Sequence, residues 1–311
     1  MSTQVTTAFS QQFSSNVYLL AQQKGSKLRG AVREESVTGE KAFFDQIGST
    51  AAIAKTTRHG DTPLVETPHS RRMVTMTTYE WADLIDDSDK VKMLIDPTST
   101  YARAAAYAMG RAQDDVIIAA ATGAALTGKS GATSTALPAG QKIAEGSANM
   151  TLAKLLEAKT TMDENDVDPE NRHIVISPEG MSALLNTTEI KSSDFNTVKA
   201  LAQGSISSFL GFEFHTSTRL TKVGNIRTCF AFQNDAILMA VGKDVTSRID
   251  ERSDKSYSTQ VYYCQSIGAY QAQFTSLVDQ CALHLGLSNV LLVIFQPETQ
   301  SCWHQCHQMH L

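Results

Sequence analysis

The sequence lacks both a long hydrophobic run and an N-terminal signal peptide. Its first residues are polar and contain no basic segment followed by an apolar one, which a secretory signal requires. The most apolar stretch, residues 281–295, is interrupted by His284, Ser288 and Asn289 and is too short to cross a bilayer. These absences predict a soluble protein that stays inside the cell in which it is made.

Cysteine is scarce, odd in number and confined to the later part of the chain. The five cysteines are Cys229, Cys264, Cys281, Cys302 and Cys306. This distribution predicts reduced thiols rather than a disulfide framework. The tail also holds His304, His307 and His310, but the packed Cys and His run does not match the separated ligand pairs of structural zinc sites. We therefore expect no metal site and an exposed, unstructured tail.

The N-terminal end of the chain lacks acidic residues, and the C-terminal end lacks lysine and arginine. Residues 1–33 contain no Asp or Glu, and no Lys or Arg occurs after Lys255. The whole chain has a net charge of −5, whereas a protein dedicated to nucleic-acid binding is normally basic over at least one domain. The whole-chain charge therefore argues against dedicated nucleic-acid binding.

The N-terminal third is predicted to consist of an arm and two strands joined by a long loop. Residues 1–33 are rich in Ser, Thr and Gln and cannot bury a core alone, so we expect them to become ordered only against a partner. Residues 42–47 and 73–81 are rich in strand formers. A loop as long as residues 48–72 usually has a role outside its own domain, although a disordered surface loop is the alternative.

A long helix is the clearest local prediction. Asp96 and Pro97 supply a cap and a first-turn proline, the alanine-rich run 98–122 follows, and Gly123 ends it. Further helices are expected from residue 152, with Thr151 as its cap, and over 178–185. Strands are expected at 172–177, 212–216, 229–232, 236–241 and 260–267. Helices and strands without regular alternation predict an α+β fold.

Residues 123–130 (GAALTGKS) match the phosphate-binding pattern GxxxxGK[ST]. In a nucleotide hydrolase that loop follows a strand and opens a helix, with Lys129 and Ser130 at the phosphates and metal. Here a helix precedes the match, and the run after it is broken by Gly and Pro. The context therefore disfavours nucleotide hydrolysis.

No other constellation predicts catalysis. Two acidic clusters, 83–89 and 163–168, lack the glycine and closing glutamate of a calcium loop and are interpreted as solvated charge. The isolated histidines are interpreted as structural, namely His59, His69, His173 and His215. We therefore assign no catalytic, cofactor-binding or metal-binding residue.

The order of these parts resembles the major capsid proteins of tailed bacteriophages, which share the Johnson fold. The similar stretches are residues 43–48, 58–63, 68–72, 79–83, 96–98, 107–111, 172–178, 204–206 and 210–214. The resemblance implies an N-terminal arm, an extended β-ribbon loop, a peripheral domain with a spine helix, an axial domain, returning peripheral strands and a divergent tail. The corresponding ranges are 1–40, 41–82, 83–150, 151–234, 235–268 and 269–311.

The resemblance implies an assembly function in the virion rather than a reaction. Expected partners are further copies of the chain in hexamers and pentamers, a separate scaffolding protein, the portal, a possible decoration protein and enclosed double-stranded DNA. Some family members form Lys–Asn crosslinks, but beyond the position of Lys55 in the loop nothing supports that role here. Alternatives are a nucleotide hydrolase, a nanocompartment shell of the same fold, and a decoration or adaptor protein. Since 269–311 has no Lys or Arg, we hypothesise an extension from a changed reading frame.

Overall fold

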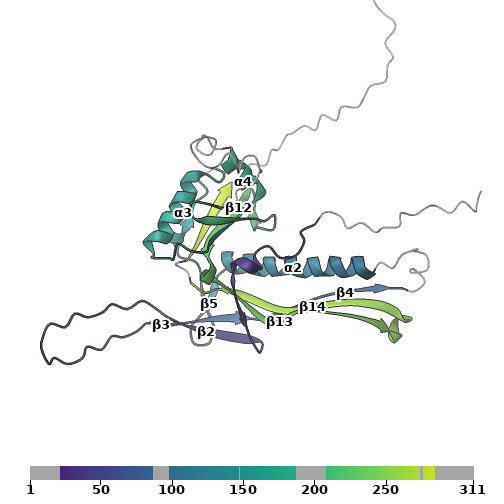
Figure 1. The fold of residues 1–311 in the computed structure, drawn as a ribbon, viewed down its shortest axis with the longest axis horizontal. Coiled ribbons are helices and arrows are strands. Elements are labelled where there is room, and N and C mark those ends of the chain that lie inside the picture. The colour runs from purple at the N-terminus through teal and green to yellow at the C-terminus, as the bar shows by residue number, and fades with distance from the viewer. Residues whose placement is uncertain (1–21, 87–97, 147, 187–207, 274–275, 284–311) are drawn as a thin grey trace, which may run out of the picture.

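The computed structural model describes residues 22–86, 98–146, 148–186, 208–273 and 276–283. Within these ranges the chain forms three sheets and one long helix, which lies along one of the sheets (Figure 1). Short 3₁₀ helices link the elements at Arg29–Ala31, Ala139–Gln141, Asn234–Ala236 and Ser253–Lys255. No helix in the described ranges is both long and apolar enough to span a membrane.

The long helix α2 lies along a four-stranded sheet. It runs over Thr98–Thr122, as predicted; the expected cap at residues 96–97 lies outside the described residues. The sheet has the order β1-β13-β14-β4, with the strands β1 Arg33–Ser36, β13 Ile237–Arg252, β14 Ser258–Gln271 and β4 Thr77–Ile85. Buried amides join the layers, because Gln265 donates to the carbonyl of Met109 at 3.0 Å and accepts from Gln113 at 2.9 Å.

A second four-stranded sheet carries the long loop. Its order is β2-β3-β5-β6, with the strands β2 Lys41–Ile47, β3 His69–Thr75, β5 Ala125–Thr127 and β6 Thr133–Thr135. The single strand predicted over 73–81 is wrong. It is two strands in two different sheets, and the chain changes sheet at Met76, whose N–H donates to the carbonyl of Glu40 at 2.9 Å.

The third sheet has seven strands and carries two helices. Its order is β7-β15-β12-β8-β10-β9, and β11 also pairs with β12. The strands are β7 Lys142–Ile143, β15 Leu277–Leu283, β12 Ile226–Gln233, β8 Arg172–Ile176, β10 Phe212–Thr216, β9 Ser208–Phe209 and β11 Lys222–Val223. The helices are α3 Leu152–Glu164, capped by Thr151, and α4 Pro178–Leu185, capped by Ser177. Both helices and the buried strand β8 confirm the predictions for this region.

Two expectations about the ends of the fold need correction. Residues 22–36 of the expected arm dock on their own chain, with Leu28 fully buried and β1 paired in parallel with β13. The divergent tail was placed too early at residue 269, because β14 continues to Gln271 and β15 pairs with β12 inside the seven-stranded sheet. Leu277 and Val278 belong to the main core, so residues 276–283 are integral to the fold.

Candidate functional site

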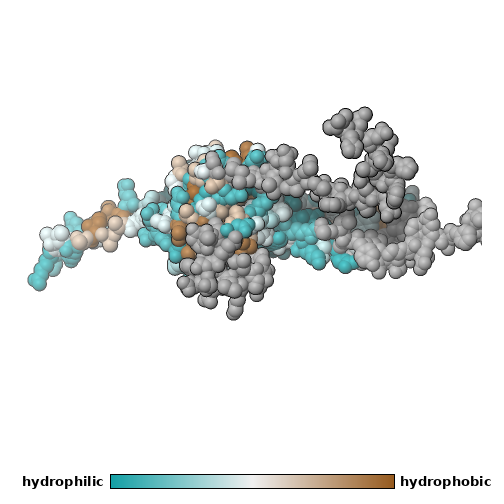
Figure 2. All heavy atoms as spheres, turned by 90° about the horizontal axis from the view of Figure 1, so that it is seen from above, coloured by the Kyte–Doolittle hydropathy of each residue, from teal (hydrophilic) through white to brown (hydrophobic). Residues whose placement is uncertain are grey.

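A long, exposed loop joins β2 and β3, here called the β2–β3 loop (residues 48–68). It has no regular secondary structure, and the N–H of Gly48 donates to the carbonyl of Pro68 at 2.8 Å where the loop leaves the sheet. It projects far from the rest of the chain (Figure 1), and hydrophobic side chains gather along part of this projection in Figure 2. Leu64 is 96% exposed and Ile53 is 57% exposed.

Exposed apolar side chains on a thin projection cannot be buried by the chain that carries them. Burial of a Leu or Ile side chain is worth about 1.5–3 kcal/mol, and contiguous apolar surface of this kind marks interaction sites. The β2–β3 loop is therefore a candidate interaction surface.

Charged residues hold the base of the β2–β3 loop. Arg71 on β3 pairs with Asp45 opposite it on β2, with Nε to Oδ1 at 2.5 Å, and its guanidinium lies 5.6 Å from the centre of the Phe43 ring. This hydrogen-bonded pairing lowers the pKa of Asp45 and raises that of Arg71. Because both side chains are exposed, the pair contributes more to strand register than to stability.

The GxxxxGKS match lies next to this base and does not have the structure of a phosphate-binding loop. Gly123 ends α2, with its N–H donating to the carbonyl of Ala119 at 2.9 Å, so a helix precedes the match. The next residues form the hairpin β5–β6, and Lys129 lies exposed in its turn. A hairpin has no helix N-terminus at which phosphate N–H donors converge, so the nucleotide-hydrolase alternative is wrong.

The N-terminal segment 22–32 is anchored on α2 by a buried carboxylate. Asp114 is fully buried and accepts hydrogen bonds from Gln23, Ser26 and the backbone N–H groups of Lys27 and Leu28. One turn earlier on α2, Gly110 leaves room for this segment, because a Cβ there would lie 2.5 Å from backbone atoms of residues 25 and 26.

The acidic cluster 163–168 is held by hydrogen bonds from an arginine. The buried guanidinium of Arg172 donates to the Asp163 carboxylate at 2.6 Å, the Asp168 carbonyl at 2.9 Å and the Val167 carbonyl at 2.5 Å. The positive charge of Arg172 thus balances the carboxylate of Asp163. In the other acidic cluster Asp83 lies on β4, whereas Asp87 and Asp89 lie outside the described residues.

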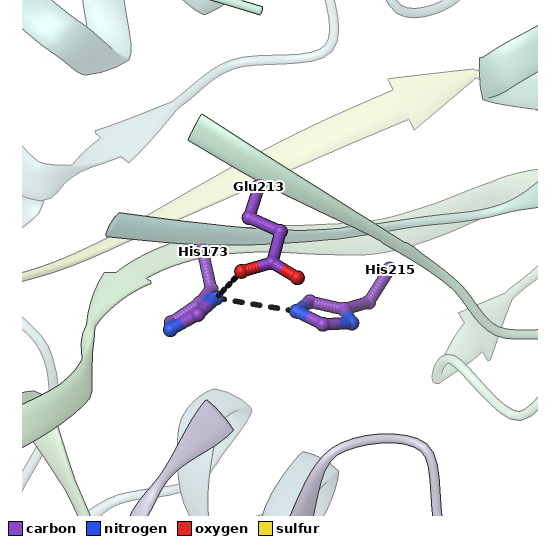
Figure 3. Close-up of side chains that lie close together, drawn as sticks. All are labelled: His173, Glu213 and His215. Carbon is purple, nitrogen blue, oxygen red and sulfur yellow. Dashed lines mark hydrogen bonds and ion pairs between the residues drawn. The ribbon is translucent and has the colours of Figure 1, made fainter. Parts of the chain in front are cut away.

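Two of the four histidines interpreted as isolated are in direct contact. His173 on β8 and His215 on β10 approach each other with Nδ1 and Nε2 3.2 Å apart, and Glu213 Oε2 lies 3.4 Å from His173 Nδ1 (Figure 3). The pKa of each histidine is lowered, mainly by burial. Sequence inspection missed the cluster because 42 residues separate the histidines, and only the pairing of β8 with β10 brings them together.

The remaining candidate residues lie exposed on the described part of the chain or outside it. Lys55 is exposed in the β2–β3 loop, and His59 and His69 lie exposed in or beside it. Of the tail's candidate zinc ligands, Cys302, His304, Cys306, His307 and His310 all lie outside the described residues.

The fold matches solved phage capsid structures over nearly its whole length. The capsid of cyanophage P-SCSP1u gives a TM-score of 0.70 at 18% identity, covering 90% of this chain and 94% of that one. The capsid of cyanophage Pam1 gives 0.68 at 11% identity, covering 90% and 98%, and that of Helicobacter pylori bacteriophage KHP30 gives 0.68 at 9%, covering 89% and 96%. At such identities the likeness establishes the fold, which is the predicted Johnson fold of phage major capsid proteins.

Comparison at the level of sequence identifies the family. Curated protein sequences give no significant match. A family model described as phage capsid protein matches residues 5–280, which includes most of β15 and again places the end of the family pattern later than residue 269. This match covers most of the chain and accounts for the expected role in the virion as a structural subunit rather than an enzyme. The chain therefore belongs to the phage capsid protein family.

Proposed function

We propose that the chain builds an icosahedral head from hexamers and pentamers in which the β2–β3 loop lies across a neighbouring subunit. The exposed apolar side chains of the loop carry the proposal, since a subunit cannot bury Leu64 or Ile53 by itself. A closed lattice covers every copy of such a loop, and obligate interfaces commonly bury more than about 2,000 Å².

The architecture supports a division into a peripheral and an axial part, with boundaries that differ from those expected. The peripheral part would comprise α2 with the sheet β1-β13-β14-β4. The axial part would comprise α3, α4 and the seven-stranded sheet, and it would be discontinuous, because β15 returns to this sheet after β13 and β14. The chain then passes between the two parts three times, namely between α2 and β7, between β12 and β13, and between β14 and β15.

The distal end of the β13–β14 hairpin is a second candidate contact. It carries Arg248, Asp250 and Arg252 around a shallow hollow, with Ile249 and Tyr257 exposed nearby. Mixed charges beside apolar side chains favour register and orientation at an interface more than raw affinity.

The other proposed partners follow from the same assembly. A separate scaffolding protein would guide curvature, the portal would occupy one vertex, and a decoration protein is a further candidate partner. The net charge of −5 favours an inner wall that encloses double-stranded DNA without binding it tightly or by sequence. The nanocompartment alternative shares this fold, and the phage capsid family match favours a virion shell over it.

The test is to shorten the β2–β3 loop without disturbing its strands. Replacing residues 49–67 by a two-residue turn keeps β2 and β3 paired, because Gly48 and Pro68 are already hydrogen-bonded neighbours. The variant and the intact chain would each be co-expressed with the candidate scaffolding protein and imaged by negative-stain electron microscopy. We expect closed shells from the intact chain and only small folded species from the variant.

A matched control changes the loop without removing its apolar residues. Lys55→Ala should assemble normally, because nothing beyond the position of Lys55 supports a crosslinking role. Normal shells from the shortened variant would overturn the proposed role of the loop. Failure of the intact chain to form any shell with its scaffolding partner would instead count against the assembly proposal as a whole.

A further inference from the structure

We propose that His173, Glu213 and His215 form a binding site for a divalent transition-metal ion of the zinc type. This inference is independent of the proposed role of the β2–β3 loop, which lies on a different sheet. The placement and chemistry of the three side chains support it.

The strand register brings the three ligands to one face of the sheet. β8 and β10 are parallel neighbours in which Glu213 pairs with His173, and His215 follows Glu213 by two residues. Side chains two residues apart on a strand point to the same face. The three donor groups therefore converge from adjacent strands, which Figure 3 shows directly.

Two of the three separations between donor atoms are close to those around a tetrahedral metal ion. His173 Nδ1 lies 3.2 Å from His215 Nε2 and 3.4 Å from Glu213 Oε2, and the three ligand atoms all lie within 4.8 Å of one another. Zn–N bonds of about 2.0–2.1 Å at a tetrahedral angle place neighbouring ligand atoms about 3.3–3.4 Å apart. An ion could enter with small side-chain adjustments on rigid strands.

The chemistry of the three side chains suits a transition-metal ion. Two imidazoles and one carboxylate suit zinc and its first-row neighbours, whereas magnesium and calcium prefer oxygen donors alone.

The surroundings leave the site accessible from one side. His173 is buried and its ring lies 5.6 Å from that of Phe232, whereas Glu213 is exposed. Solvent can thus supply a water molecule as the fourth ligand. An ion here would clamp β8 to β10 beside Thr216, whose carbonyl accepts a hydrogen bond of 2.9 Å from Lys27 of the N-terminal segment.

The first experiment measures zinc binding by the purified full-length chain after treatment with a chelator. Isothermal titration with zinc chloride should show one ion bound through this cluster, and zinc at a hundred times its Kd should raise the Tm by roughly 5 °C. Magnesium should produce no rise. Glu213→Gln and His215→Ala alter less buried ligands than His173, and each should weaken zinc binding at least tenfold, whereas the exposed His69→Ala is the matched control that leaves it unchanged.

A second measurement separates this site from the cysteines and histidines of the tail. Cobalt bound by nitrogen and oxygen alone gives visible d–d bands without the near-ultraviolet thiolate charge-transfer band. We expect that spectrum from a chain carrying Cys302→Ser and Cys306→Ser, and its loss after the further change His215→Ala. The proposal is overturned if zinc neither binds nor stabilises the chain, or if Glu213→Gln and His215→Ala bind zinc as tightly as the unaltered chain.

Discussion

The backbone N–H of Lys27 donates to both carboxylate oxygens of Asp114, each at a distance of 3.1 Å. A side chain in the middle of α2 thereby orders a segment 87 residues earlier in the chain. Because the carboxylate is fully buried, its hydrogen bonds decide whether residues 22–32 lie on the helix or in solvent.

Removing the Asp114 carboxylate should release this segment. Asp114→Ala leaves the N–H groups of Lys27 and Leu28 without their acceptor, and we expect a loss of about 3 kcal/mol in the free energy of unfolding. Urea unfolding of the unassembled subunit measures the loss, and hydrogen exchange shows whether it is concentrated in residues 22–32. Asp115→Ala is the matched control, because Asp115 forms only an exposed pair with Arg219 and should cost less than about 1 kcal/mol. Equal losses from the two variants would contradict the anchoring role of Asp114.

Gly110→Ala should lower the stability of the subunit, although the same substitution usually stabilises a helix. Gly→Ala inside a helix normally stabilises by about 1 kcal/mol, because alanine has the higher helix propensity. Here the added methyl group would lie 2.5 Å from backbone atoms of Gly25 and Ser26, so Gly110→Ala should destabilise the subunit by roughly 1–3 kcal/mol. Thermal unfolding measures the difference. Gly140→Ala is a suitable control, since a Cβ there meets nothing within 4 Å, and a gain in stability for Gly110→Ala would refute the close approach.

Arg172 should be essential to the turn between α3 and β8. Its buried guanidinium satisfies one carboxylate and two carbonyl groups at once, so we expect Arg172→Ala to cost about 3 kcal/mol. Arg172→Lys should recover only part of this, because an ammonium group cannot reach three acceptors in a planar arrangement. Urea unfolding gives the values, with the exposed Arg252→Ala as control. A calcium-dependent rise in Tm that survives Arg172→Ala would instead favour a cation in this turn.

Asp279 should make the subunit less stable as the pH rises. Burial raises its pKa from 3.8 to about 6, opposed by the positive charge of Lys142. The folded state then binds this proton more tightly than the unfolded state. The contribution of Asp279 to the free energy of unfolding is therefore greatest below pH 4, falls as the pH rises to about 6, and stays constant at higher pH. Asp279→Asn removes the dependence and should stabilise the subunit at pH 7.5 by up to about 3 kcal/mol.

The control for Asp279 is Asp254, a carboxylate whose pKa is lowered rather than raised. Hydrogen bonding to Arg252 lowers the pKa of Asp254 to about 2, so its contribution is present above pH 4 and is lost as the pH falls toward 2. Asp254→Asn should therefore lower stability slightly above pH 4 and leave it unchanged as the pH falls toward 2. Urea unfolding between pH 3 and 8 separates the two, and an unchanged pH profile for Asp279→Asn would contradict the assignment to that residue.

Local signals in the sequence were sufficient for much of the secondary structure. The alanine-rich run ended by Gly123 predicted α2 to the residue, and Ser177 with Pro178 predicted α4, because caps and first-turn prolines act within one turn. The short apolar run at β8 predicted a buried strand, because such a run is also a local signal. The order of these parts also predicted the capsid fold, which the family match confirms.

The tertiary structure alone decided which residues far apart in the chain contact one another. Strand propensity over 73–81 could not show that the chain changes sheet at Met76, and a polar segment such as 22–32 could not reveal its buried acceptor Asp114. The meeting of His173 with Glu213 and His215 depends on the register of two strands that are distant in sequence. Local propensity acts over a few residues, whereas sheet partners and buried carboxylates are selected by long-range packing, so only the folded chain places them.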